Sequence, residues 1–65
     1  NAVAPGLVDT PLTADWTQAQ ALWRERAPLR RAAQPQDIAQ AVALLAASDY
    51  LTGEVLLLDG GLNLT

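Results

Sequence analysis

Apolar residues in the middle of the chain recur at helical spacing. The positions that carry the pattern are Ile38, Ala41, Val42 and Leu45, which fall at i, i+3, i+4 and i+7. This periodicity is typical of an amphipathic helix that buries one face. Pro35 suits the first helical position, and Asp37 lies in the first turn, where a carboxylate favours the unpaired amides. The pattern therefore predicts a helix over residues 35–47.

A second periodic segment precedes this helix. Asp15 and Gln18 have the spacing of a capping box, so we expect a helix that begins near Thr13 or Asp15 and ends near Arg26. Its apolar positions are Trp16, Ala19 and Trp23, which places both tryptophans on one face. That face either packs in a core, as indoles commonly do, or covers a substrate as part of a mobile lid.

Short continuous apolar runs lie near both ends of the chain. Residues 55–58 do not alternate with polar residues, which is typical of a strand covered on both faces. Residues 2–4 form a second extended segment, and Pro5 with Gly6 ends it in a turn. Residues 59–61 end the later strand in another turn. The order strand, helix, helix, strand predicts a parallel, right-handed crossover.

Composition excludes several classes of function. The net charge is −3, and all four cationic residues are arginines within residues 24–31, a footprint too narrow for nucleic acid. No cysteine or histidine is available for a disulfide or a thiolate or imidazole metal site, so we expect no metal site and a cytoplasmic location. No apolar run approaches the roughly 20 residues of a membrane span. The Arg30–Arg31 pair either meets a phosphate or carboxylate or is a solvated surface pair.

The chain also lacks the usual parts of a catalytic site. Histidine, cysteine and lysine are absent, Tyr50 is the only phenol, and the acidic residues are spread out. We therefore expect no catalytic residue in this chain. In an open parallel sheet, however, ligands bind beyond the carboxyl ends of the strands. Residues 6–10 would then line a crevice with free amides and one hydroxyl, unless Pro5–Gly6 is an ordinary turn.

Four motifs in order resemble the C-terminal portion of a short-chain dehydrogenase/reductase. They are Asn-Ala-Val-Ala-Pro-Gly-Leu-Val-Asp-Thr at residues 1–10, Pro-Gln-Asp-Ile-Ala at 35–39, Leu-Thr-Gly at 51–53 and Leu-Asp-Gly-Gly at 58–61. The resemblance implies an α/β fold: the C-terminal part of a Rossmann-like doubly wound parallel sheet, with the end of strand six, two helices and strand seven. Residues 1–65 would then be the C-terminal part of a single dinucleotide-binding domain whose N-terminal part is not in this chain.

The resemblance also implies roles for individual residues. The cofactor would be NAD or NADP, held by Pro5, Gly6, Leu7, Val8 and Thr10. In such enzymes the Val8 amide would meet the nicotinamide carboxamide, and the Thr10 hydroxyl would meet the carboxamide or a phosphate. Leu12 and Trp16 would touch a small carbonyl or alcohol substrate, with a 3-oxoacyl thioester or a related carbonyl compound as first expectation.

Departures from the family pattern are equally informative. The family's glycine-rich turn, catalytic serine and Tyr-x-x-x-Lys pair all precede the matching region, and Glu54 stands where a lysine would follow Tyr50. Tyr50 is therefore not the family's catalytic tyrosine. The resemblance implies a homodimer or homotetramer that joins through strand 52–58 and helix 35–47. The alternative is a non-catalytic structural or oligomerisation fragment that uses the same surfaces.

Overall fold

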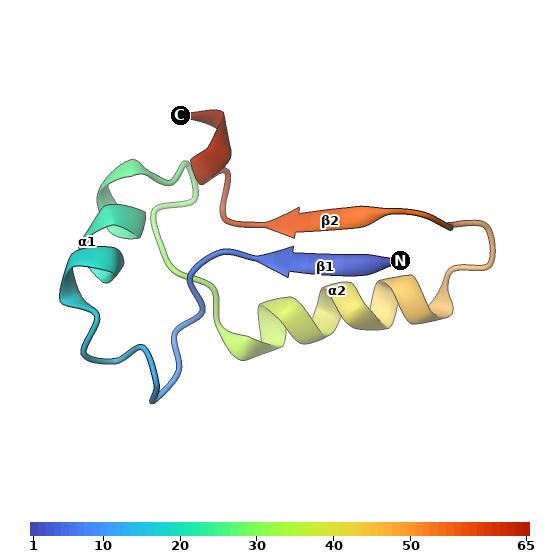
Figure 1. Ribbon diagram of the computed structural model, residues 1–65, viewed down its shortest axis with the longest axis horizontal. Coiled ribbons are helices and arrows are strands. Elements are labelled where there is room, and N and C mark those ends of the chain that lie inside the picture. Colours follow the sequence, from blue (N-terminus) through green and yellow to red (C-terminus); the bar gives the residue numbers. More distant parts are fainter.

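The computed structural model describes residues 1–65 as two parallel strands with two helices between them in sequence (Figure 1). The elements are β1 (Ala2–Pro5), α1 (Thr17–Arg26), α2 (Pro35–Ala47), β2 (Val55–Leu58) and the short 3-10 helix η1 (Leu62–Leu64). The predicted order of strand, helix, helix and strand is confirmed, and so is the parallel pairing. The handedness of the crossover stays a prediction.

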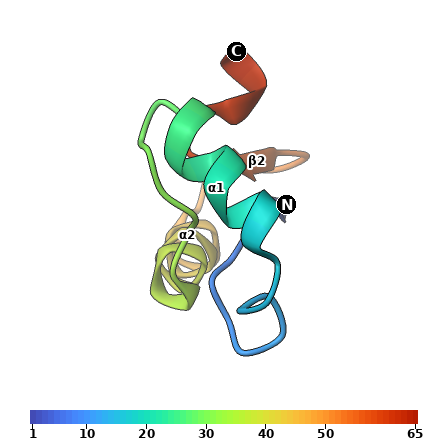
Figure 2. The ribbon, with the colours of Figure 1, turned by 90° about the vertical axis from the view of Figure 1, so that its left-hand side faces the viewer.

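The two strands pair in parallel over their whole length. Ala2 lies opposite Val55, and Pro5 lies opposite Leu58. The pairing continues past the strand, because the Gly6 N–H donates to the Leu58 carbonyl at 3.0 Å. Both strands therefore end at the same edge, where α1, η1 and the loop after β1 gather (Figure 1). Figure 2 shows α2 along one side of the strands and α1 across their carboxyl ends.

Helix α2 forms where the sequence predicts it. The Gln34 N–H donates to the Asp37 carboxylate at 2.7 Å, which satisfies one of the amides that precede the first turn. At the other end the Ser48 hydroxyl donates to the Leu44 carbonyl at 2.7 Å. Ala41 is buried, but Val42 is 49% exposed, so the packed face is narrower than the predicted one. Two strands are too few to cover the full apolar stripe.

Helix α1 begins later than predicted, and the expected Asp15–Gln18 capping box is wrong. The first helical residue is Thr17, and Trp16 occupies the N-cap position without a side-chain capping bond. Residues 11–15 form turns instead, because the Thr13 hydroxyl is engaged in the loop after β1. The helix ends at Arg26 as predicted, since Pro28 disfavours helical backbone in the residue before it.

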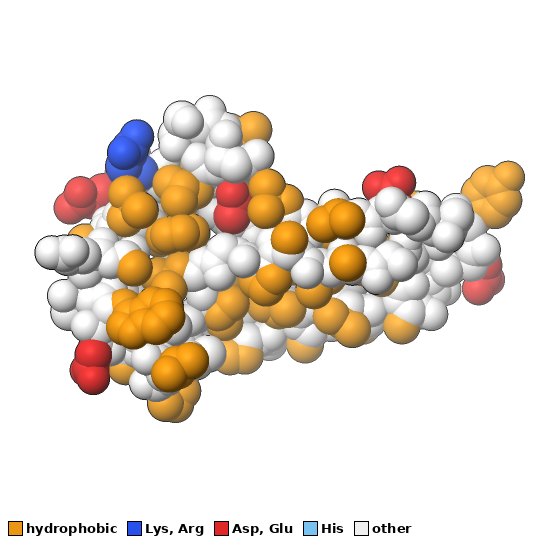
Figure 3. Space-filling model, viewed as in Figure 1, with side chains coloured by type: hydrophobic (Ala, Val, Ile, Leu, Met, Phe, Trp, Pro, Cys, Tyr) orange, Lys and Arg blue, Asp and Glu red, His pale blue; other side chains and the backbone are white.

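Strand β2 is covered on only one face within this chain, so the coverage of its second face, by residues outside this chain, stays a prediction. Leu56 and Leu58 are half-buried, whereas Val55 and Leu57 are 66% and 51% exposed. Figure 3 shows apolar side chains spread over the strands and α2, with arginines at the α1 end. The buried apolar core is small and consists of Leu7, Ala27, Ala32 and Ala41. Neither helix has the length and apolar character to cross a membrane.

Candidate cofactor-binding site

The loop after β1 is held against the segment that precedes α2. Ala33 makes two hydrogen bonds with this loop: its N–H donates to the Leu7 carbonyl at 2.9 Å, and its carbonyl accepts from the Asp9 N–H at 2.7 Å. Val8 thereby forms an isolated parallel bridge with Ala33. The loop is therefore an extended, fixed wall at the carboxyl edge of the sheet.

This wall presents unpaired backbone donors. Neither the Leu7 N–H nor the Val8 N–H takes part in a hydrogen bond within the chain. The Leu7 side chain is buried, so this residue contributes packing and its backbone, whereas Val8 is half-buried. Backbone N–H groups at partly buried positions are normally paired. Two unpaired donors in one loop are the kind of group that an oxygen-bearing ligand would satisfy.

Thr10 brings a hydroxyl to the same loop, and Thr13 organises it. The Thr13 hydroxyl donates to the Val8 carbonyl at 2.7 Å and accepts from the Thr10 N–H at 3.0 Å. Thr13 is buried, although the sequence pattern indicated it only as a possible helix start. The spacing Thr-x-x-Thr, separated from the Pro-Gly turn by three residues, was the available signal, because Ser and Thr side chains commonly bond nearby backbone in turns.

Position 6 has no room for a side chain, because Trp23 lies against the Gly6 backbone. A Cβ atom at Gly6 would meet Trp23 Cζ2 at 2.9 Å and Asp59 Cβ at 3.0 Å. The Trp23 indole N–H donates to the Asp59 carbonyl at 3.2 Å, which ties α1 to the end of β2. Trp23 is half-buried and packs against Gly6 and Asp59, whereas Trp16 on the same face is exposed, so the two tryptophans divide between the two alternatives. The space that the missing side chain leaves is filled by the Trp23 indole.

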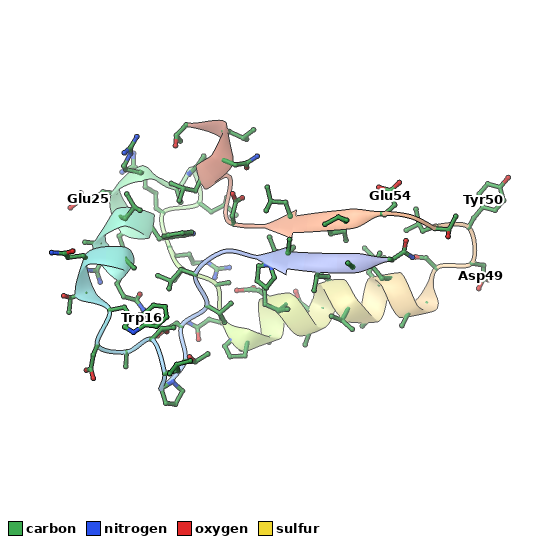
Figure 4. The ribbon with its side chains drawn as sticks, viewed as in Figure 1. Trp16, Glu25, Asp49, Tyr50 and Glu54 are labelled. Carbon is green, nitrogen blue, oxygen red and sulfur yellow. The ribbon has the colours of Figure 1, made fainter.

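The residues expected to touch substrate lie on the surface at the same end. Leu12 is 78% exposed and Trp16 is 51% exposed. Figure 4 places Trp16 beside α1 and Tyr50, Asp49 and Glu54 at the opposite end of the molecule. Tyr50 is fully exposed there, which agrees with its exclusion from the site. Pro5, the last residue of β1, is exposed at the carboxyl edge.

An ion pair joins the start of α2 to the segment before it, and a hydrogen bond joins that segment to the loop after β1. Arg31 donates to both Asp37 carboxylate oxygens, at 2.7 and 3.3 Å, and Gln34 Nε2 donates to the Asp9 carboxylate at 3.3 Å. Of the two alternatives for the arginine pair, Arg31 thus meets a carboxylate, while Arg30 is solvated. The hydrogen bonds from Arg31 and from the Gln34 amide lower the pKa of Asp37 below its usual value.

We expect this pair to make stability depend on pH. Because the pKa of Asp37 is lowered in the folded state, its contribution is present above the unfolded pKa of 3.8 and is lost as pH falls through the folded pKa. In the full-length protein, Asp37→Asn should lower the melting temperature near neutral pH, and the difference from wild type should disappear in acid. Melting curves between about pH 2.5 and 7 bracket this range. A difference that stays constant with pH would contradict the assignment.

The chain supplies one wall of a site rather than an enclosed pocket. Its hollows include one of about 240 Å³ beside Leu29, Ile38 and Leu58, with the Arg31–Asp37 pair at its edge. Residues 5–10 line none of the hollows. No group of three or more acidic, histidine or cysteine side chains is close enough to hold a metal ion.

The two parallel strands, connected through α1 and α2, form an α/β unit, and in open sheets of this kind ligands bind beyond the carboxyl ends of the strands. A sequence profile described as enoyl-(acyl carrier protein) reductase matches residues 1–63. The chain belongs to the short-chain dehydrogenase/reductase family, and it corresponds to the C-terminal part of that fold. The resemblance and the fold class expected from the sequence are thereby confirmed.

Individual relatives agree with this assignment. The chain is 45% identical to the 3-oxoacyl-[acyl-carrier-protein] reductase of Bos taurus, over 100% of this chain and 27% of that protein. It is 45% identical to carbonyl reductase family member 4 of Danio rerio, over 98% of this chain and 26% of that protein. The structure of the ligand-free aldohexose dehydrogenase of Thermoplasma acidophilum is similar to this chain, with a TM-score of 0.81 and 33% sequence identity. The match covers 100% of this chain and 31% of the dehydrogenase chain. The chain thus spans about a quarter of the length of its curated relatives.

Proposed function

We propose that the whole protein is an oxidoreductase that transfers hydride between NAD or NADP and a carbonyl or alcohol substrate, and that residues 1–65 form the nicotinamide wall of its dinucleotide-binding domain. The observation that carries the proposal is the unpaired Val8 amide in the same loop as the half-buried Thr10 hydroxyl. Membership of the short-chain dehydrogenase/reductase family supports it. The acid–base groups come from the rest of the protein.

The donors of the loop suit a nicotinamide carboxamide. The Val8 N–H is free to donate to the carboxamide oxygen, and the half-buried Thr10 hydroxyl can bond the carboxamide or a nearby phosphate. Pro5 and Gly6 set the turn, and Leu7 anchors it through its buried side chain. When bound, the nicotinamide supplies or accepts the hydride, while the protein orients the ring.

The substrate side is assigned to Leu12 and Trp16. Both are exposed apolar side chains at the carboxyl end, where a substrate could be covered. Relatives that reduce 3-oxoacyl-[acyl-carrier-protein], or that are described as carbonyl reductases, favour a carbonyl substrate, with a 3-oxoacyl thioester first. Apolar side chains that cover the substrate also exclude water from the place where the hydride is transferred.

The assembly forms the remaining part of the proposal. Val42 and Leu44 on α2 and Val55 and Leu57 on β2 are large, apolar and exposed. They support a homodimer or homotetramer that joins through strand 52–58 and helix 35–47, and we place the protein in the cytoplasm. The same exposed residues would serve a non-catalytic oligomerisation fragment, which binds no dinucleotide.

Two variants of the full-length protein test the roles together. Thr10→Val keeps the shape of the side chain and removes its hydroxyl, so the Kd for NAD⁺ or NADP⁺ should rise about three- to tenfold, the loss of one hydrogen bond. Trp16→Ala should raise the KM for a 3-oxoacyl thioester and leave the dinucleotide Kd unchanged. Isothermal titration and steady-state kinetics supply both values.

The two variants are controls for each other, because each should change one ligand only. A wild-type protein that binds neither NAD⁺ nor NADP⁺ refutes the proposal and leaves the oligomerisation fragment. If both variants affect both ligands equally, the assignments of Thr10 to the dinucleotide and of Trp16 to the substrate are wrong.

A further inference from the structure

Thr13 is the only buried polar side chain of the chain, with 8% of its surface exposed. Its hydroxyl lies 2.7 Å from the Val8 carbonyl, 3.0 Å from the Thr10 N–H, 3.3 Å from the Thr10 carbonyl and 3.5 Å from the Thr10 hydroxyl. All four contacts are to the two residues assigned to the nicotinamide. A buried hydroxyl that serves one short loop in this way is more than a packing group.

The hydroxyl of Thr13 has one hydrogen, and its distances decide where the hydrogen goes. The Val8 carbonyl is the nearest acceptor, at 2.7 Å, so it takes that hydrogen. The Thr13 oxygen then accepts from the Thr10 N–H. The 3.5 Å contact between the two hydroxyls is long for a hydrogen bond, and within it only Thr10 has a hydrogen left to donate. The lone pairs of the Thr10 hydroxyl oxygen are then left to accept a hydrogen bond from a ligand.

The peptide groups on either side of Val8 are fixed as well. The peptide that joins Leu7 to Val8 has its carbonyl on the Ala33 N–H, and in a trans peptide the Val8 N–H points the opposite way. The peptide that joins Val8 to Asp9 is held at both ends, by Thr13 at the carbonyl and by Ala33 at the N–H. The Val8 N–H thus points to the side on which Thr13 and Thr10 lie.

We propose that Thr13 is a positioning residue that makes this loop selective for a primary carboxamide. Together with Ala33, it orients one donor, the Val8 N–H, to the side of the loop that also carries the Thr10 hydroxyl, whose oxygen serves as the acceptor. A primary carboxamide offers the complementary pair, a carbonyl oxygen and an N–H. This inference rests on the proposed function, because the carboxamide is that of the nicotinamide.

The test uses the full-length protein with two substitutions of one residue. Thr13→Val keeps the volume and removes the hydroxyl, whereas Thr13→Ser keeps the hydroxyl. Thr17→Val is the matched control, since Thr17 is exposed at the start of α1 and its hydroxyl makes no hydrogen bond. The probes are NAD⁺ or NADP⁺, the same dinucleotide with an acetyl group in place of the carboxamide, and ADP-ribose or its 2′-phosphate, which lacks the nicotinamide.

We expect Thr13→Val to weaken binding of the natural dinucleotide by roughly tenfold, the loss of about one well-placed hydrogen bond. Binding of ADP-ribose should not change, and the preference for the carboxamide over the acetyl compound should disappear. Thr13→Ser should restore both the affinity and the preference. Thr17→Val should behave as wild type.

A purely structural role gives a different result. If Thr13→Val lowers the melting temperature and weakens all three probes alike, or keeps the preference for the carboxamide, Thr13 does not position the site and the inference is overturned. If wild type binds the dinucleotide no more tightly than ADP-ribose, the nicotinamide contact itself fails, and the proposed role of the loop falls with it.

Discussion

A polypeptide of these 65 residues alone is expected to show no cooperative thermal unfolding. Its accessible surface is 4711 Å², whereas a compact monomer of 6.9 kDa exposes about 4,000 Å². Its radius of gyration is 12.8 Å, against about 11 Å for a compact domain of this length. Only four apolar residues are buried. Large apolar side chains on α2 and β2, among them Val42, Leu44, Val55 and Leu57, contribute to this exposed surface.

Circular dichroism and differential scanning calorimetry of the purified 65-residue polypeptide would measure this. We expect a shallow loss of helix signal on heating, with no calorimetric peak. The full-length protein is the control and should give a sharp transition. A sharp transition of the short polypeptide as a defined oligomer would contradict the expectation and support the oligomerisation fragment.

The parts of the fold that depend on local sequence were predictable. Helix α2 has its start signal at Pro35 and Asp37 and a regular apolar stripe, so its bounds follow from residues that are close together in the chain. Strand β2 is a short apolar run between turn residues. The predicted turn at residues 59–61 is confirmed, because the Asp59 carboxylate accepts hydrogen bonds from the Gly61 and Asn63 N–H groups at 3.0 and 2.9 Å. The strands pair in parallel because α2 alone runs back along them, whereas α1 lies across their carboxyl ends.

Features that depend on distant contacts were not predictable. The start of α1 moved because the hydroxyl of Thr13 bonds Val8, a tertiary requirement that outweighs the capping-box spacing of Asp15. A side chain at position 6 would collide with Trp23, which lies 17 positions further along the chain, and hydrophobic periodicity cannot reveal such a contact. The exposure of Val55 and Leu57 depends on which residues are present to cover them.

The candidate site divides in the same way. The family motif marked the loop of Pro5 to Thr10, but motif spacing says nothing of which amides are left unpaired. That information needs the register between Val8 and Ala33, which forms only when the segment before α2 returns to the sheet. The ion pair of Arg31 with Asp37 fixes the start of that helix and so supports the same register. The site is therefore set jointly by two segments about 25 residues apart.

Substitution of Gly6 is expected to destabilise the full-length protein strongly. A Cβ atom there would lie 2.9 Å from Trp23 Cζ2, 3.0 Å from Asp59 Cβ and 3.2 Å from Asp59 Cα. The φ angle of Gly6 is not in the left-handed region, so the effect comes from packing rather than from backbone strain. Because one contact is to backbone, the neighbours cannot all move away. Gly6→Ala should lower the free energy of unfolding by about 1–3 kcal/mol, as overpacked sites do, and Gly6→Val by more.

A double-mutant cycle with Trp23→Phe identifies the cause. The phenyl ring is smaller than the indole and removes the nearest of the three contacts, although it also loses the hydrogen bond to the Asp59 carbonyl. Gly6→Ala should therefore destabilise the Trp23→Phe background less than it destabilises wild type, by about 0.5–1 kcal/mol, a coupling typical of residues in contact. Urea unfolding of the four proteins gives this energy. Additive effects would show that the indole does not confine Gly6, and that the tie between α1 and the end of β2 depends on the hydrogen bond alone.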